Sequence, residues 1–162
     1  MGFEKPSLKG RALRLLAQRE HSRAELQRKL APHEEEPGEL ARALDELQAK
    51  GFIDEQRVID SLLYRRAARL GASRVRQELQ AKGLPPDAVA QAVQSLKATE
   101  TDRAREVWRK KFGHAPADPS ARARQARFLA GRGFSGDAIR RAIGRPDPST
   151  REPDAEDSDP GA

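Results

Sequence analysis

The sequence predicts an all-α protein of three tandem three-helix repeats that form an elongated, curved array, followed by a disordered acidic C-terminal tail. Apolar residues recur at helical spacing almost throughout the chain, as at Leu8, Ala12 and Leu15. Segments 78–93 and 128–143 align without a gap, which indicates an internal repeat. Only 36% of the 162 residues are hydrophobic and 4% are aromatic. Stacked units with small local cores therefore fit better than one large core.

Local signals place nine helices along the chain. Ser22, with Glu25 three residues later, has the spacing of a capping box, and Asp118 puts a carboxylate cap before Pro119 at the first helical position. Weaker N-caps are predicted at Asp54, Thr99 and Ser135. The predicted helices run over residues 7–20, 22–31, 38–50, 54–70, 72–82, 86–97, 99–112, 119–131 and 135–143.

Glycines mark the ends of several of these helices. Gly51, Gly83 and Gly133 each follow a lysine or arginine and precede a large apolar residue, as expected where a helix closes in a positive-φ conformation. The first repeat aligns more loosely than the others because it carries an insertion around residues 32–38. The predicted units are the three helical repeats and the tail, over residues 7–53, 54–97, 98–144 and 145–162.

Charge is divided unevenly between the helical body and the tail. The formal net charge is +6, but residues 145–162 hold six acids against two arginines, a charge of −4, which leaves +10 on residues 1–144. The tail also has four prolines and no large apolar side chain, so nothing in it can offset the entropy of ordering. A basic body of this kind favours an anionic partner.

The residue types present favour a binding protein over an enzyme. The chain has no cysteine, which excludes disulfides and thiolate metal sites. His21, His33 and His114 have no metal-binding spacing, and the chain contains neither a P-loop nor a nucleophile elbow. We therefore expect no catalytic residue, no metal and no cofactor. No apolar run reaches the roughly 18 to 20 residues that a membrane span needs, so we expect a soluble, cytoplasmic protein that enters no membrane.

Basic side chains carry the clearest functional signal, because phosphate binding needs several cations on one face. One group lies around the turn after the first helix of the second repeat, and the other spans the third repeat. The alternative is a set of solvated helix faces. The predicted partner-binding or nucleic-acid-binding residues are Arg65, Arg66, Arg69, Arg74, Arg76, Lys82, Arg109, Lys110, Lys111, Arg122, Arg124, Arg127 and Arg132.

The few aromatic residues are expected to pack in the repeat cores, which is the usual role of aromatic side chains at helical positions. Base stacking is the alternative, for which Trp108 between basic residues is the best candidate. The residues in question are Tyr64, Trp108, Phe112, Phe128 and Phe134.

Five stretches of the chain, in order, resemble the RecX family of recombinase regulators: residues 12–30, 44–58, 69–84, 107–113 and 127–139. The resemblance implies three tandem three-helix repeats without enzymatic activity. It also implies binding to the RecA recombinase and to its filament on single-stranded DNA, with inhibition of the recombinase, ATPase and co-protease activities. Such a protein would regulate DNA repair, recombination and the SOS response. The segment 51–58 and the acidic tail depart from the family pattern.

The resemblance leaves open whether DNA is bound directly and whether the chain has a different function. DNA itself, single-stranded or double-stranded, is a further candidate partner, and we expect a monomer. The alternative function is a DNA-binding transcriptional regulator of the helix-turn-helix type, because residues 22–30 followed by a turn and another helix fit that motif too. Three nonidentical units argue for a scaffold instead, since a sequence-reading helix usually occurs once per protomer.

Overall fold

The computed structural model describes residues 2–144, and every regular element in that range is helical, which confirms the all-α class. Each of the nine predicted helices is present, and a short 3-10 helix, η1 (Ala31–His33), lies in the insertion of the first repeat. The α-helices are α1 (Leu8–Gln18), α2 (Arg23–Leu30), α3 (Glu39–Ala49), α4 (Glu55–Arg66), α5 (Ala72–Ala81), α6 (Pro86–Lys97), α7 (Glu100–Lys111), α8 (Pro119–Gly131) and α9 (Gly136–Ala142).

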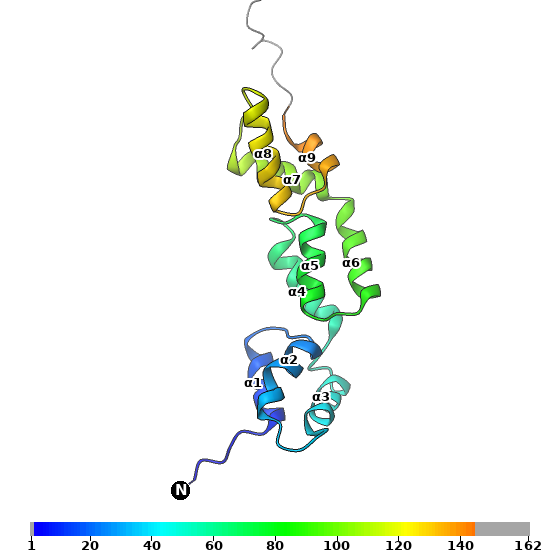
Figure 1. Cartoon of the computed structure of the whole chain (residues 1–162). Helices are drawn as coiled ribbons and strands as arrows, with labels where there is room; N and C mark the ends of the chain where they lie inside the picture. Colours follow the sequence, from blue (N-terminus) through cyan, green and yellow to red (C-terminus); the bar gives the residue numbers. More distant parts are fainter. Residues whose placement is uncertain (1, 145–162) are drawn as a thin grey trace, which may run out of the picture.

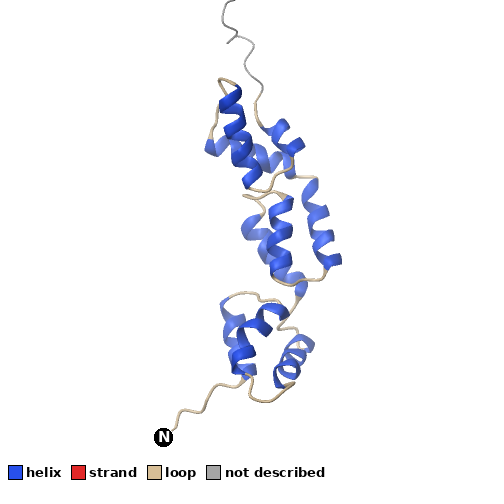
Figure 2. Cartoon of the chain, in the orientation of Figure 1, coloured by secondary structure: helices blue, strands red, loops and turns tan. Residues whose placement is uncertain are grey.

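The helices form three groups, α1–α3, α4–α6 and α7–α9, that follow one another along a single long axis (Figure 1). Short loops connect the helices within and between the groups (Figure 2). The predicted acidic tail lies outside the described residues, and the exact bounds of the repeats stay a prediction.

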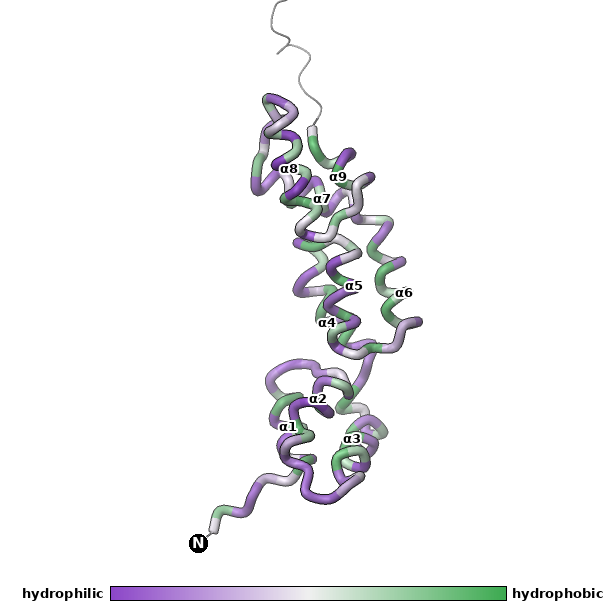
Figure 3. Tube along the Cα trace, viewed as in Figure 1, coloured by the Kyte–Doolittle hydropathy of each residue, from purple (hydrophilic) through white to green (hydrophobic). Residues whose placement is uncertain are grey.

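Each group has its own hydrophobic core, as the low content of apolar residues predicts. Leu44 in the first core, Leu79 in the second and Leu129 in the third are fully buried. Hydrophobic and hydrophilic residues alternate along the helices (Figure 3), so each helix gives one face to its local core and the other to solvent. No single core runs through the described part of the chain, and the array depends on how the groups are joined.

Most of the predicted helix ends are confirmed. Ser22 and Glu25 form both hydrogen bonds of a capping box, and the carboxylate of Asp118 accepts from the backbone N–H of Ala121. Thr99 is the exception, because its hydroxyl donates to the carbonyl of Leu96 in the preceding helix and does not cap α7. The predicted side-chain caps at Asp54 and Ser135 and the positive φ angles of Gly51, Gly83 and Gly133 are confirmed.

Helix α4 is shorter than its sequence pattern predicts, because it ends at Arg66 and not near residue 70. The guanidinium of Arg103, from α7, donates hydrogen bonds to the carbonyls of Ala67 and Leu70 at this turn, and to the carbonyl of Leu96 at the end of α6. Arg103, a residue of the next repeat, thus supplies the hydrogen bonds to these carbonyls that backbone N–H groups would supply if α4 were longer.

The second helices of the three repeats, α2, α5 and α8, join end to end. The hydroxyl of Ser22, the N-cap of α2, donates to the carbonyl of Lys82 at the end of α5. One repeat further on, the backbone N–H of Gly71, the N-cap of α5, donates to the carbonyl of Arg132 at the end of α8, over 2.8 Å. The positive end of each helix dipole therefore meets the negative end of the next.

Candidate anion-binding surface

The thirteen predicted binding residues are mostly exposed, but they do not form one continuous surface. Eleven of them are exposed, whereas Lys82 and Arg122 are half-buried. Arg65 and Arg69 lie on α4 and the turn that follows it, and Arg124 and Arg127 lie along α8.

Several of these cations are already engaged inside the chain. Arg66 pairs with Glu78 at 2.8 Å, and both Arg109 and Lys110 pair with Glu106 on the same helix. Lys82 contacts the buried carboxylate of Glu25, and its own side chain is only 17% exposed. Arg122 donates to the carbonyl of Gly144. The ammonium of Lys82 is thus part of the joint between the first two repeats, and we leave it out of the surface proposed below.

The equivalent positions at the two joints carry different charges. Glu25 is the third residue of α2, and Arg74 is the third residue of α5. Lys82 and Arg132 correspond in the internal repeat, each preceding a positive-φ glycine. The joint between repeats 1 and 2 therefore holds an acid and a base, which form an ion pair 2.8 Å long. The joint between repeats 2 and 3 holds two arginines at the same places.

The repeat 2–repeat 3 joint is tightly packed around Gly133. A Cβ atom at Gly133 would lie 2.5 Å from the Cβ of Arg74, and one at Gly71 would lie 2.2 Å from the backbone of Gly133. Glycine at both positions lets the two repeats approach closely. The close approach brings arginines from the two sequence groups, Arg74 and Arg132, to the same joint.

Further cations surround this joint. A hollow of about 460 Å³ between the two repeats is lined by Arg76 and Lys97 and reaches the buried ring of Phe134. At the C-terminal ends of α7 and α8, the ammonium of Lys111 and the guanidinium of Arg132 lie 5.4 and 5.0 Å, respectively, from the centre of the Phe128 ring. We define the junction surface as Arg74, Arg76, Lys97, Lys111 and Arg132.

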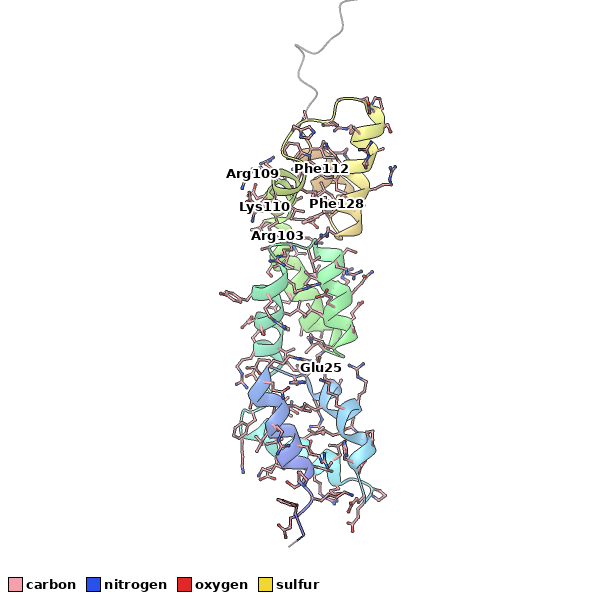
Figure 4. All side chains as sticks on the ribbon, turned by 90° about the vertical axis from the view of Figure 1, so that its left-hand side faces the viewer. Glu25, Arg103, Arg109, Lys110, Phe112 and Phe128 are labelled. Atoms are coloured by element: carbon pink, nitrogen blue, oxygen red, sulfur yellow. The ribbon has the colours of Figure 1, made fainter. Side chains whose placement is uncertain are left out.

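An aromatic pair lies beside this surface. The rings of Phe112 and Phe128 meet edge to face, with their centres 5.5 Å apart (Figure 4). Because Lys111 and Arg132 both lie against Phe128, the ring fixes where these two charges are held. The same view places Arg103 between repeats 2 and 3, and Glu25 between repeats 1 and 2.

None of the five cations of the junction surface forms an ion pair with a carboxylate of residues 2–144. Glu100 lines the hollow, but it is buried and its carboxylate accepts the backbone N–H of Ala72, at the start of α5. Gly71, the N-cap residue of α5, has no side chain that could cap the helix. The negative charge of Glu100 takes this place and lies at the N-terminus of α5. The junction surface is left with unneutralised positive charge.

One feature of the site differs from expectation, the exposure of Tyr64, whereas Trp108 packs against the third core as expected. Tyr64 does not pack in a core, because it is 91% exposed, next to Arg65. The core face of α4 is formed by Val58, Ile59 and Leu62, and a residue two positions after Leu62 points away from that face. Trp108 is half-buried, and its indole N–H donates to the buried amide of Gln125 over 2.8 Å, so it offers no free platform for a base.

Residues 131–136 read Gly-Arg-Gly-Phe-Ser-Gly, which has the glycine spacing of a dinucleotide-binding loop. That motif needs a preceding strand, whereas this segment connects α8 to α9. Within the described residues, no cluster of His, Asp and Glu side chains is arranged to hold a metal ion. None of the helices described here has the length and apolar character needed to cross a membrane.

The geometry thus defines a class: a helical-repeat protein whose repeats are joined through aligned helix ends, and which presents cations at one joint. Three family models match in order, "RecX, first three-helix domain" at residues 9–47, "RecX, second three-helix domain" at 54–93 and "RecX, third three-helix domain" at 98–143. The chain belongs to the RecX family of regulatory proteins.

Proteins named RecX are similar to this chain, and the alignments cover most of both sequences. Regulatory protein RecX of Leptothrix cholodnii is 56% identical, over 85% of this chain and 87% of its own. Regulatory protein RecX of Ralstonia nicotianae is 46% identical, over 85% and 86%. The fold matches a crystal structure of RecX from Lactobacillus salivarius with a TM-score of 0.70 at 16% identity, covering 82% of this chain and 90% of that one.

Proposed function

We propose that this chain is a non-enzymatic regulator that binds the RecA recombinase and its filament on single-stranded DNA, and that it inhibits the recombinase, ATPase and co-protease activities of RecA. Membership of the RecX family supports the partner. The junction surface supports the mode of binding, with phosphates or carboxylates of the filament as its ligands.

The main observation behind this proposal is the difference between the two joints. The first joint has an acid and a base, and the second has two arginines at the equivalent positions. A Glu–Lys pair stabilises the first joint, so the fold alone gives no reason to place two like charges at the second. Like charges at a tight joint repel each other, and that repulsion lowers stability unless an anion neutralises it. An anionic partner gives these arginines a role that the isolated protein does not.

A sequence-reading helix-turn-helix protein fits this structure less well. Such proteins contact bases with the N-terminal residues of the recognition helix. In this chain the motif would consist of α2, the turn and α3, so α3 would be the recognition helix. The carboxylate of Glu34 accepts the backbone N–H groups of Gly38 and Leu40 at the N-terminus of α3, and Glu39 is its first residue. The first turn of α3 therefore presents negative charge, which a DNA groove repels.

Cosedimentation with RecA filaments tests the proposal. The protein is mixed with RecA that has been assembled on single-stranded DNA, with the same DNA alone, and with a random library of duplexes. We expect it to sediment with the filaments in a RecA-dependent manner and to select no duplex sequence. A failure to bind filaments would refute the proposal, and selection of one operator-like duplex would favour the transcriptional regulator.

A further inference from the structure

A second basic site lies on the first repeat, away from the junction surface. It is a hollow of about 230 Å³ lined by residues of α1, α2 and η1. Figure 1 shows α1 and α2 in the group of helices at the amino-terminal end of the array. Its lining contains no aspartate or glutamate and consists of Arg11, Arg14, Leu15, Gln18, Lys29, Leu30 and His33.

The three permanent cations of this hollow have no acidic partner in residues 2–144. Arg11, Arg14 and Lys29 form no ion pair there, whereas four other basic residues of the first repeat do: Lys9, Arg19, Arg23 and Lys50. A neighbouring hollow shares Arg11 and His33 and is also lined by Glu35 and Glu39, of which Glu35 pairs with Lys5. The positive charge of the hollow is therefore available to a ligand.

A buried histidine holds one of these cations in place. His21 is only 1% exposed, and its Nδ1 lies 3.0 Å from the carbonyl oxygen of Arg19. A carbonyl can only accept, so Nδ1 carries the hydrogen and Nε2 is left as an acceptor for Lys29 Nζ, 3.3 Å away. Burial lowers the pKa of His21, which keeps the ring neutral. Lys29 is thus oriented by an uncharged group and not by a carboxylate.

The floor of the hollow is apolar. Leu30 is buried and Leu15 is partly buried, and both belong to or pack against the core of the first repeat. A phosphodiester backbone would satisfy the cations but has no apolar group to cover these leucines. A peptide that carries carboxylates beside an apolar side chain matches both features, since the acids reach the rim and the apolar group covers the floor.

We propose that this hollow is a docking site for an acidic peptide segment of a partner protein, with carboxylates on Arg11, Arg14 and Lys29 and one apolar side chain against Leu15 and Leu30. This site lies outside the junction surface and does not depend on the proposed inhibition of RecA. It gives the first repeat a contact of its own, separate from the phosphate-compatible cations of repeats 2 and 3.

The test uses the full-length protein and three fluorescent probes. One is a short peptide with a central leucine flanked by glutamates, the second has serine in place of that leucine, and the third is an oligothymidylate. Binding is followed by anisotropy for the parent and for the double variant Arg14→Glu, Lys29→Glu. The matched control is Arg42→Glu, Arg140→Glu, which makes the same charge change at exposed positions of α3 and α9, outside the hollow and outside the predicted binding residues. Circular dichroism checks that both variants stay folded.

We expect the leucine peptide to bind the parent, and the hollow variant to lose about tenfold or more in affinity while the control loses about twofold or less. The serine peptide should bind several-fold more weakly. Equal binding of the two peptides, or equal losses in the two variants, would overturn the proposal. A hollow variant that loses oligothymidylate binding and keeps peptide binding would reassign the hollow to nucleic acid. No RecA is present in the assay, so its outcome is independent of the proposed function.

Discussion

The carboxylate of Glu25 lies 2.8 Å from Nζ of Lys82 and ties the start of α2 to the end of α5. The same positions one repeat further along are Arg74 and Arg132, so the second joint keeps the stacking and loses the ion pair. The first joint is therefore stabilised by an ion pair, whereas the second exposes positive charge at a place where the two backbones are in close contact. This difference is the basis of the predictions below.

The variant Arg74→Glu should be at least as stable as the parent. The change puts an acid at the third position of α5, the position that Glu25 holds in α2, where it lies at the positive end of the helix dipole. We expect a gain of about 0.5–1 kcal/mol in the free energy of unfolding, measured by urea denaturation. Loss of stability would show that the two joints are not equivalent.

The variant Glu25→Gln should be less stable than the parent, by about 2 kcal/mol near neutral pH. Its amide oxygen can still accept the backbone N–H of Ser22, but the negative charge is lost and Lys82 is left half-buried without its ionic partner. Burial alone would raise the pKa of Glu25, but hydrogen bonds from Lys82, the backbone of Ser22 and Arg19 outweigh it and lower the pKa to about 2. The contribution is therefore complete above about pH 4.5, the usual value, and is lost as the pH falls toward 2.

Urea denaturation of Glu25→Gln and the parent between pH 7 and pH 2 measures this difference. The two stabilities should converge as the pH falls. Glu46→Gln is the control, since Glu46 also has a lowered pKa, of about 2, from its hydrogen bonds with Lys9 and Lys50 but is exposed, so its effect should be much smaller. A constant gap between Glu25→Gln and parent across this range would contradict the ion-pair account.

Three glycine-to-alanine variants should separate backbone strain from crowding. Gly51 has a φ of 80° and open space around it, so Gly51→Ala should cost about 1 kcal/mol from strain alone. Gly71→Ala has no such strain but places a methyl group against the backbone of Gly133, for a cost of about 1–3 kcal/mol. Gly133→Ala combines both and should be the least stable in thermal denaturation. An equal loss in all three would rule out close packing at the second joint.

Arg103 should tolerate no replacement, not even by lysine. Its guanidinium donates to the carbonyls of Ala67, Leu70 and Leu96, and burial lowers its pKa. An ammonium cannot span these acceptors in one plane, so Arg103→Lys should cost about 1–3 kcal/mol. Arg105→Lys on the exposed face of α7 is the matched control and should change little. The melting temperatures of the two variants are compared with that of the parent. Similar melting temperatures for Arg103→Lys and Arg105→Lys would contradict a stabilising role for the three hydrogen bonds of Arg103.

Much of the fold follows from local sequence signals. The capping box at Ser22, the Asp118 cap and the glycines at helix ends act within one turn of the backbone, and the sequence predicts all of them. Thr99 and the end of α4 are predicted wrongly because partners outside the local segment decide them: the carbonyl of Leu96 takes the Thr99 hydroxyl, and Arg103 takes the carbonyls after α4.

The residues that form the junction surface are harder to predict from the sequence than the helices, because their positions depend on how the repeats are stacked. Ser22 meets Lys82 across 60 positions, and no local pattern indicates that contact. Lys97 joins the junction surface only because α6 ends beside the next repeat. The exposure of Tyr64 could have been predicted, since it is out of phase with the core face of α4. The roles of the thirteen basic residues in binding stay a prediction.

ATP hydrolysis by RecA on single-stranded DNA, measured with increasing amounts of the parent, of Arg74→Glu and of Arg42→Glu, tests the central claim most directly. Arg42 is exposed on α3 and forms no ion pair within residues 2–144, so it controls for the charge change. We expect the parent and Arg42→Glu to inhibit equally, and Arg74→Glu to need about tenfold more protein despite its undiminished stability, with the difference shrinking at higher salt. Equal inhibition by all three would contradict the role of the junction surface, and no inhibition by the parent would contradict the proposed function itself.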